Sequence, residues 1–169
     1  FMALAGQLGV DVPRTLCFNA VASIGAADMR KIVYPCYLKA AVSVAGVGIY
    51  RCENKQAFLA ALGKFAEDVP VQVQEELRTE TFLNLQYRVI GNQVIRLAAS
   101  EQILHGFAHQ GNRVPASHEP WEAVEPMAEW LKDRGMKGIF AFDVAVVQTG
   151  TGLRFPAIEC NPRFNGASY

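Results

Sequence analysis

The sequence has no excess of charge of either sign and no long hydrophobic run. Sixteen basic residues balance sixteen acidic ones among 169 residues, so no chain-wide field attracts nucleic acid or an anionic membrane. The longest apolar stretches are of strand length and are interrupted by Arg, Lys or Glu, which excludes a bilayer-spanning helix. The sequence therefore predicts a soluble protein that binds neither nucleic acid nor a membrane. Any anion-binding function must come from a local site.

Cysteine is scarce as well. The four cysteines are scattered and form no CxxC pair, so in a chain of this size they do not amount to a disulfide framework. Reduced thiols in a cytoplasm are the simpler interpretation, and we expect a cytoplasmic protein. With 51% hydrophobic and 19% charged residues, the chain is too apolar to be disordered and long enough to bury a core. The cysteines are Cys17, Cys36, Cys52 and Cys160.

The two ends of the sequence indicate a fragment of a longer protein. Phe1-Met2 is not a natural start, and the chain stops at Tyr169 directly after a polar, motif-like stretch. We expect a preceding N-terminal domain and a C-terminal continuation to be missing.

Hydrophobic periodicity and turn residues predict two α+β lobes, at residues 19–76 and 77–169, after the end of a helix and a linker at residues 1–18. The elements expected in the first lobe are a helix at 26–32, strands at 36–40 and 49–52, a helix at 55–67 capped by Asn54, and a strand at 71–75. The elements expected in the second lobe are strands at 82–89 and 94–99, a polar loop at 106–118, a helix from Pro120 to Gly135, and a hairpin with strands at 139–147 and 154–160.

A group of polar residues on the C-terminal hairpin is the strongest functional signal. Asp143 lies on one strand, and Glu159 and Asn161 lie two residues apart on the other, where strand periodicity puts both side chains on one face. Two carboxylates and an amide oxygen are suitable ligands for Mg²⁺ that carries nucleotide phosphates. Arg163, again two residues further, would place a guanidinium beside them, where it can pair with phosphate oxygens.

A simpler interpretation is that Glu159 and Arg163 form a surface ion pair while Asp143 is a solvated strand residue. Asp143, however, lies within an otherwise apolar nine-residue run, where a charge is costly unless a cation neutralises it. This favours the metal site. Cys160, between the two ligands on its strand, is expected to face the core, and the three histidines, His105, His109 and His118, are assigned no role.

Two weaker signals lie in the first lobe. Lys39 ends a short apolar strand before a small-residue turn, in which Gly46 and Gly48 free backbone N–H groups to cradle phosphates. A glycine pair is usually only a turn, however, and a strand lysine usually points to solvent. The segment 74–77 would offer backbone groups to an adenine edge and Leu77 to its face, although adjacent glutamates are more often simply solvated.

Taken together, these segments resemble the ATP-grasp superfamily, in the family's order and over nearly the whole chain. The Glu-Cys-Asn-Pro-Arg block with its upstream aspartate is the most specific part. Within the superfamily, the chain looks most similar to biotin-carboxylase-related enzymes of the carboxylate–amine ligase type. The matching segments are 34–39, the small-residue loop to Gly48, 73–77, Phe142-Asp143 and 158–166.

The resemblance implies an ATP-grasp fold, with two α+β lobes of antiparallel sheet and the nucleotide between them. It implies ATP and one or two Mg²⁺ ions, which Mn²⁺ can replace, as cofactors. The resemblance implies that Lys39 binds phosphate and that Ser43 to Gly48, including Gly46, form a mobile loop that closes over the phosphates. Glu75, Glu76 and Leu77 would line the adenine pocket, and Glu80 would bind the ribose. Asp143, Glu159 and Asn161 would bind the metal, and Arg163 would stabilise the transferred phosphoryl group.

The implied reaction is the activation of a carboxylate as an acyl phosphate, with release of ADP, followed by attack of an amine or similar nucleophile. Lys39 and Arg163 would stabilise charge during phosphoryl transfer. The implied partners are ATP, a carboxylic acid and an amine, and a homodimer is one expected assembly. Three alternatives stay open: a biotin-carboxylase-like carboxylase that activates bicarbonate, a regulatory module that binds ATP without turning it over, and a purely structural fragment.

Overall fold

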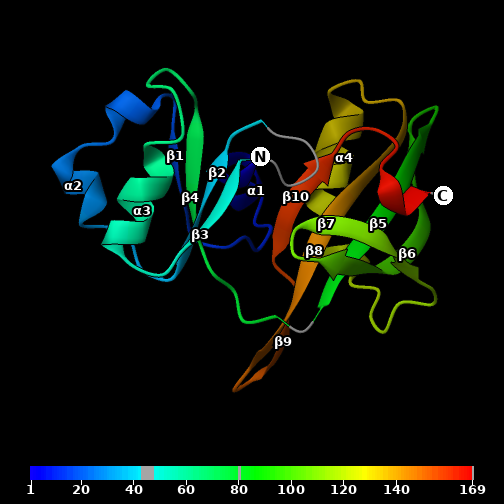
Figure 1. The fold of residues 1–169 in the computed structure, drawn as a ribbon. Coiled ribbons are helices and arrows are strands. Elements are labelled where there is room, and N and C mark those ends of the chain that lie inside the picture. The colour runs from blue at the N-terminus through cyan, green and yellow to red at the C-terminus, as the bar shows by residue number, and fades with distance from the viewer. Residues whose placement is uncertain (43–47, 80, 169) are drawn as a thin grey trace. The chain divides into compact units, whose positions relative to one another are not determined.

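Two antiparallel sheets form the framework of the described part of the protein, and each carries its own hydrophobic core (Figure 1). The computed structural model describes residues 1–42, 48–79 and 81–168. Residues 1–12 and 77–169 make up one unit, called unit 1, and residues 13–76 make up unit 2. The expectation of an α+β fold built on antiparallel sheets is confirmed.

The sheet of unit 2 has one apolar face and one polar face. On β2, Cys36 and Leu38 are buried in the core that Phe58 of helix α3 completes, whereas Tyr37 and Lys39 alternate with them and lie on the other face. The strand order is β1-β4-β2-β3. The elements are β1 (Thr15–Phe18), η1 (Val21–Ser23), α2 (Ala26–Met29), β2 (Cys36–Ala40), β3 (Ile49–Cys52), α3 (Lys55–Leu62) and β4 (Val71–Glu75).

Unit 1 repeats this alternation on a larger sheet. Leu83, Leu85 and Tyr87 of β5 are fully buried, and the Tyr87 ring stacks on Phe140 of β8 with 5.5 Å between the ring centroids. The strand order is β10-β8-β5-β6-β7, with β9 paired to β8 in a projecting hairpin (Figure 1). The elements are α1 (Met2–Gln7), β5 (Thr81–Ile90), β6 (Gln93–His105), β7 (Ala108–Arg113), η2 (Trp121–Ala123), α4 (Glu125–Asp133), β8 (Gly138–Thr149), β9 (Gly152–Arg154), β10 (Ala157–Asn161) and η3 (Gly166–Ser168).

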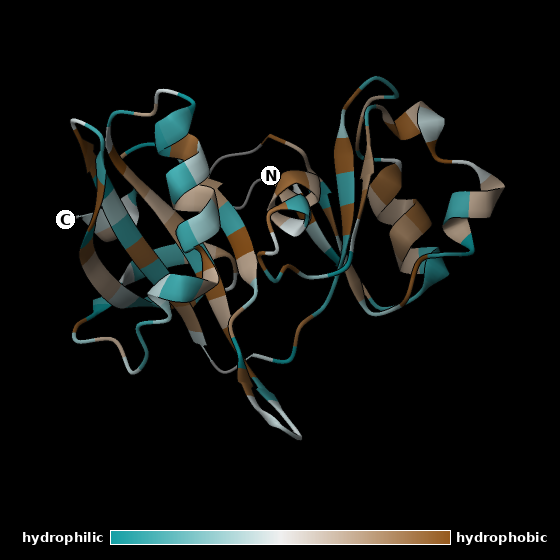
Figure 2. Ribbon diagram, turned by 180° about the vertical axis from the view of Figure 1, so that it is seen from behind, coloured by the Kyte–Doolittle hydropathy of each residue, from teal (hydrophilic) through white to brown (hydrophobic). Residues whose placement is uncertain are grey.

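The face of the unit 1 sheet opposite this core is polar in its middle. Asn84 and Gln86 alternate with the core residues of β5, and yet they are only 1% and 6% exposed. The change of hydropathy from one residue to the next is visible along the strands in Figure 2. A polar sheet face that is also buried must satisfy its hydrogen-bonding groups internally, which makes it a natural place for a binding site.

Several elements differ from the sequence-based expectations. Helix α2 ends at Met29 rather than at residue 32, and α4 begins at Glu125, after the short helix η2, rather than at Pro120. The strand expected at 154–160 is divided into β9 and β10.

The linker expected before residue 19 contains strand β1, and the polar loop expected at 106–118 contains strand β7. Both are short edge strands, for which backbone pairing with a neighbour decides the structure more than composition does. Helix α3 ends at Leu62 rather than at residue 67, because Gly63 follows it. Strand β6 continues to His105, beyond the expected end at residue 99.

Residues 2–7 form helix α1, as expected, and Ala5 and Val10 belong to the core of unit 1. None of the described helices is long and apolar enough to cross a membrane.

The N-cap of α3 is a testable local contribution to stability. The Asn54 side chain accepts a 2.9 Å hydrogen bond from the backbone N–H of Ala57. We expect Asn54→Ala to lower the free energy of unfolding by about 1 kcal/mol, and Asn54→Ser to restore most of it, as measured by urea denaturation. Lys55→Ala, at the neighbouring exposed position, is the control. Equal stability of Asn54→Ala and the unsubstituted chain would show that the cap contributes nothing.

Candidate functional site

Three strands of unit 1 bring polar side chains into one row across the sheet. Asp143 of β8 lies directly opposite Asn84 of β5 on one side and Glu159 of β10 on the other. The amide of Asn84 donates a 2.7 Å hydrogen bond to Oδ1 of Asp143, and the amide of Asn161 donates one of 3.3 Å to Oδ2. The expectation that Asp143, Glu159 and Asn161 lie on one face is therefore confirmed.

A β-bulge in β10 produces this alignment. Ala157 pairs with Val144, but Glu159 pairs with Asp143, so one extra residue of β10 lies between these pairs. Without the bulge, Ile158 would lie opposite Asp143, and Glu159 would lie opposite the buried Phe142. The bulge thus lets Ala157 pack in the core while Glu159 lies on the polar face.

Burial dominates the protonation chemistry of Asp143. It raises the pKa of this carboxyl group from 3.8 to about 6, because a charge is poorly solvated inside the sheet. The hydrogen bond from Asn84 lowers the pKa, the charge of Glu159 raises it, and the hydrogen bond from Asn161 and the His109 ring lower it by smaller amounts. The amides thus compensate only part of the cost of burying the charged form.

The donor set of this row fits a magnesium ion. Oδ1 of Asn84 is buried and has no hydrogen-bond partner among the described residues, and Glu159 is exposed at the rim. No three His, Cys, Asp or Glu side chains gather around one point in the described ranges, so a metal here would depend on two carboxylates with amide oxygens. Magnesium in nucleotide sites usually takes one or two carboxylates, with water and phosphate completing its shell.

On the polar face of unit 2, a hydrogen-bonded chain holds Lys39. Its ammonium donates to Oε1 of Gln74 at 2.5 Å, and the Gln74 amide nitrogen donates to Oγ1 of Thr15 at 3.2 Å. Gln74 itself is only 3% exposed. Lys39 is therefore oriented along the sheet by a buried, neutral acceptor.

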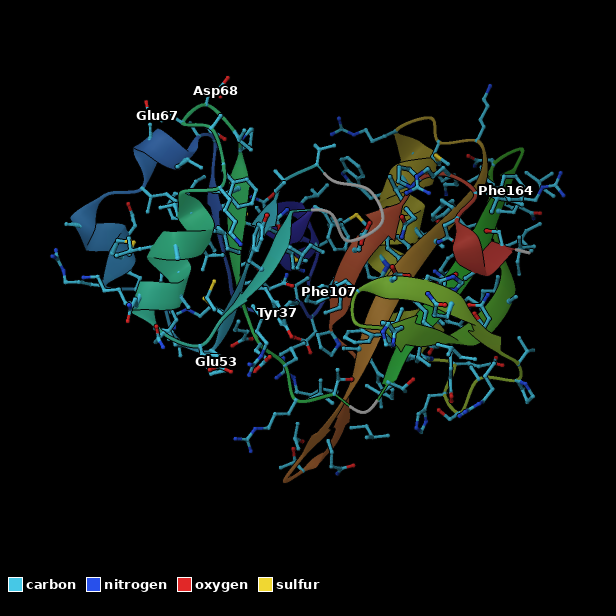
Figure 3. The ribbon with its side chains drawn as sticks, viewed as in Figure 1. Tyr37, Glu53, Glu67, Asp68, Phe107 and Phe164 are labelled. Carbon is cyan, nitrogen blue, oxygen red and sulfur yellow. The ribbon has the colours of Figure 1, made fainter. Side chains whose placement is uncertain are left out.

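The two adjacent glutamates at the end of β4 have different partners. Glu76 accepts two hydrogen bonds from the guanidinium of Arg51, at 2.5 and 3.0 Å, and one of 2.9 Å from the Tyr37 hydroxyl. Glu75 accepts a 2.8 Å hydrogen bond from the backbone N–H of Arg14. Both carboxylates thus have partners within unit 2, and their place in an adenine pocket, like that of Leu77, stays a prediction. Figure 3 labels Tyr37 on this sheet.

Solved structures share this fold over nearly the whole chain. The N5-carboxyaminoimidazole synthetase of Staphylococcus aureus complexed with ADP matches with a TM-score of 0.78 at 15% identity, over 98% of this chain and 44% of that one. The biotin carboxylase of Campylobacter jejuni, in a β,γ-ATP complex, matches with 0.75 at 21% identity, over 96% and 39%. The carboxyaminoimidazole ribonucleotide synthase of Aspergillus clavatus complexed with ATP matches with 0.74 at 14% identity, over 98% and 44%.

The chain has the ATP-grasp fold. It spans less than half the length of each of these structures. Neither a protein-family model nor a curated protein matches the sequence. At these identities the likeness establishes the fold, and the functions of the residues rest on the geometry described above.

Several residues expected at an ATP-grasp nucleotide site are not in the groups described so far. Ser43, Gly46 and Glu80 lie outside the described residues. Gly48 has a φ of +73°, a left-handed conformation that favours glycine, and its carbonyl accepts a 3.0 Å hydrogen bond from the backbone N–H of Ala40. It thus supports the end of the β2–β3 turn.

Strand geometry does not extend to Arg163. Strand β10 ends at Asn161, and after Pro162 the exposed Arg163 lies in a bend, where its guanidinium donates a 3.1 Å hydrogen bond to the carbonyl of Phe164. The two-residue alternation that predicted its position therefore stops before it. Cys160, by contrast, packs against the unit 1 core as expected, and burial raises its thiol pKa to about 12.

A further polar group, absent from the sequence-based predictions, lies on the same face of this sheet. Ser100 lies opposite Asn84, and Asn112 of β7 contacts both Ser100, at 3.5 Å, and Nε2 of His109, at 3.0 Å. The chain after Arg163 folds back against this group, because Asn112 donates to the carbonyl of Gly166 at 3.4 Å. A polar residue alternating with buried apolar ones, the signal that singled out Asp143, was also present at Asn84.

Because the charge of Asp143 is poorly solvated, we expect the stability of the protein to depend on pH in the absence of divalent cations. Because the pKa of Asp143 is higher in the folded state than in the unfolded state, the folded protein binds the extra proton between about pH 4 and pH 6, and stability from this group falls as the pH rises through that window. Asp143→Asn removes this loss. The stability of the variant relative to the unsubstituted chain should therefore increase by roughly 2–3 kcal/mol between pH 4 and pH 7.

Urea denaturation in EDTA buffers across this pH range measures that difference. Asp68→Asn, at an exposed position in the turn before β4 (Figure 3), is the matched control and should show no such trend. A constant difference between Asp143→Asn and the unsubstituted chain would contradict the burial of the charge.

Proposed function

We propose that this chain binds Mg-ATP as the nucleotide-binding part of an ADP-forming ligase, which activates a carboxylate as an acyl phosphate for attack by an amine. One observation carries the proposal: the aligned row of Asn84, Asp143 and Glu159, with Asn161 beside it, lies on a sheet of the ATP-grasp fold. Structures of similar fold are complexed with ADP or ATP.

In this proposal each polar group has a distinct task. Asp143, Glu159 and Asn161 would hold Mg²⁺, which neutralises phosphate charge when bound. Lys39 donates hydrogen bonds to phosphate oxygens, and the exposed guanidinium of Arg163 pairs with the phosphoryl group in transfer. These roles concern alignment and charge, since phosphoryl transfer needs little covalent chemistry from a protein.

The proposed reaction has two steps. A carboxylate oxygen attacks the γ-phosphorus of ATP, and the bond to the bridging oxygen breaks, so that ADP leaves with that electron pair. An amine then attacks the acyl carbon, phosphate leaves, and the amine loses a proton. Water must be kept from the acyl phosphate between the two steps, because hydrolysis would waste it.

The names of the similar structures favour a second candidate, in which bicarbonate is the activated acid. N5-carboxyaminoimidazole ribonucleotide synthetase and biotin carboxylase are both named for the attachment of a carboxyl group. Bicarbonate would use the same nucleotide-binding residues as another carboxylate, and the two candidates differ only in the acid. ADP release that needs bicarbonate and an amine would select this candidate, whereas release with an organic acid in bicarbonate-free buffer would select the first. Binding of Mg-ATP by the full-length protein without ADP release under any of these conditions would indicate a regulatory module.

Substitution of the proposed metal ligands tests the proposal directly. Asp143→Asn and Glu159→Gln should each weaken Mg-ATP binding at pH 7.5 by at least about tenfold, because each removes a carboxylate from the donor set. Isothermal titration calorimetry with Mg-ATP, and with ATP in EDTA, measures both the affinity and its dependence on the metal.

Glu67→Gln is the matched control, since Glu67 is exposed on the turn before β4 (Figure 3). It removes the same charge at a position with no proposed role and should bind Mg-ATP as the unsubstituted chain does. Unchanged affinity in Asp143→Asn and Glu159→Gln would remove the basis of the proposal.

A further inference from the structure

The core of unit 2 contains two cysteines that face each other across neighbouring strands. Cys36 of β2 lies directly opposite Cys52 of β3 in the antiparallel register, and the two residues are only 1% and 0% exposed. Both thiols are free. Because residues directly opposite each other in an antiparallel pair have neighbouring side chains, the two thiols occupy one part of the core.

The thiols also contact each other. The Cys52 thiol donates a hydrogen bond to the carbonyl of Tyr50, with 3.6 Å between sulfur and oxygen. In the hydrogen bond between the two cysteine side chains, Cys36 is therefore the donor and the sulfur of Cys52 the acceptor. The two sulfur atoms thus point toward one another.

The spacing of these strands suits a disulfide bond. The backbone N–H of Ala40 donates to the carbonyl of Gly48 at 3.0 Å, and the register of β2 and β3 continues from there to the cysteines. Hydrogen-bonded and non-hydrogen-bonded pairs alternate along an antiparallel ladder, so Cys36 and Cys52, four residues away on each strand, form another hydrogen-bonded pair. The Cα atoms of such a pair are about 5.5 Å apart, within the roughly 4.4–6.8 Å that a disulfide spans.

We propose that Cys36 and Cys52 are a site of reversible oxidative modification, at which a low-molecular-weight disulfide such as glutathione disulfide converts the two thiols into a cross-strand disulfide bond. Cβ atoms in opposed pairs are about 4.5–5.5 Å apart, whereas a disulfide prefers about 3.5–4.5 Å. The two strands must therefore move slightly closer, and the resulting strain makes the bond easy to reduce again. This inference does not depend on the proposed function.

Local opening of β3 gives the oxidant access to the site. Among the described strands of unit 2, β3 is the last in the order β1-β4-β2-β3, so only β2 pairs with it. An element with fewer contacts opens at a lower free energy than a central strand. While β3 is closed the thiols react slowly, because burial raises the pKa of Cys36 to about 12 and also raises that of Cys52, and only a thiolate attacks a disulfide.

The modification consists of two exchange steps. The exposed Cys52 thiol loses its proton and attacks one sulfur of glutathione disulfide, the S–S bond breaks, and one glutathione leaves as a thiolate. Before β3 closes again, Cys36 loses its proton and attacks the Cys52 sulfur, and the second glutathione leaves as a thiolate. Two cysteine thiols are thus oxidised, one small disulfide is reduced to two thiols, and the two protons end on glutathione.

Oxidation of the folded chain tests the proposal. The unsubstituted chain is incubated with glutathione disulfide in buffer without urea, its remaining thiols are alkylated, and a tryptic digest is analysed by mass spectrometry without reduction. Trypsin cleaves after Lys39 and Arg51, so the two cysteines fall on separate peptides, 32–39 and 52–55. We expect these peptides to be joined, with a mass two hydrogen atoms below their sum, and reduced glutathione should separate them.

Two substitutions provide controls. Cys17→Ser removes an exposed thiol of the same unit and should leave the joined peptides unchanged. Cys52→Ala should abolish them, and Cys36 should form no link to Cys17 instead, because the neighbours of Cys17 on β1 pack against the core while Cys17 itself is exposed. Far-ultraviolet circular dichroism shows whether each variant is folded, and the digest of the unsubstituted chain stays decisive if Cys52→Ala is not.

Amide hydrogen exchange measures the structural effect of the bond. Because the disulfide ties β3 to β2, the backbone N–H groups of Arg51 and Cys52 should exchange at least about tenfold more slowly in the oxidised chain than in the reduced chain. Equal exchange rates in the two forms would contradict local opening of β3 as the route to the site.

Other outcomes of the digest would overturn the proposal. Modification of Cys17 alone, with Cys36 and Cys52 still reduced, would show that the pair serves only as apolar packing. Joined peptides that appear only when urea is added would show that the folded chain does not form the bond, and glutathione attached singly to Cys36 or Cys52 would show that the two sulfur atoms do not meet.

Discussion

The partial burial of the Asp143 carboxylate in the middle of the sheet is the constraint on which the rest of unit 1 depends. A charge at this place is costly unless dipoles or a cation compensate it. Two amides, from Asn84 and Asn161, meet its two oxygens, and they come from the strands on either side of β8. This arrangement requires β5, β8 and β10 to pair in one register, since a slip by one residue would move each side chain to the other face.

The β-bulge of β10 follows from the same constraint. The strand must bury Ala157 on the core face and present Glu159 beside Asp143, and a regular strand cannot place two residues of the same parity on opposite faces. Bulges are often found next to functional sites, where they redirect a side chain. The irregularity here has a clear geometric effect, because it creates the pair of neighbouring carboxylates.

Unit 2 also carries charged side chains on one face of its sheet, and they have different kinds of partner. That face carries a cation and, just beyond the end of β4, a carboxylate: Lys39 contacts the neutral Gln74, and Glu76 contacts Arg51 through two parallel hydrogen bonds. Partly exposed ion pairs contribute little to stability, but a bidentate pair fixes geometry well.

Local patterns in the sequence determined much of this protein. The strands at 36–40, 49–52 and 71–75 have the bounds expected from alternation and turn residues, and Asn54 caps α3 as expected. The same alternation placed Glu159 and Asn161 on one face. All of these depend on neighbours within a few residues, which a sequence shows directly.

Only the tertiary structure decided how segments that are distant in the sequence pair with one another. The edge strand β7 has a composition close to that of a loop, and β1 is a run of only four residues; both exist because β6 and β4 pair with them. The partnership of Asn84 with Asp143 joins residues 59 positions apart in the chain, and the bulge that aligns Glu159 with Asp143 appears only in the register of β10 on β8. Register between strands depends on packing against a shared core, and no single strand carries that information in its own sequence.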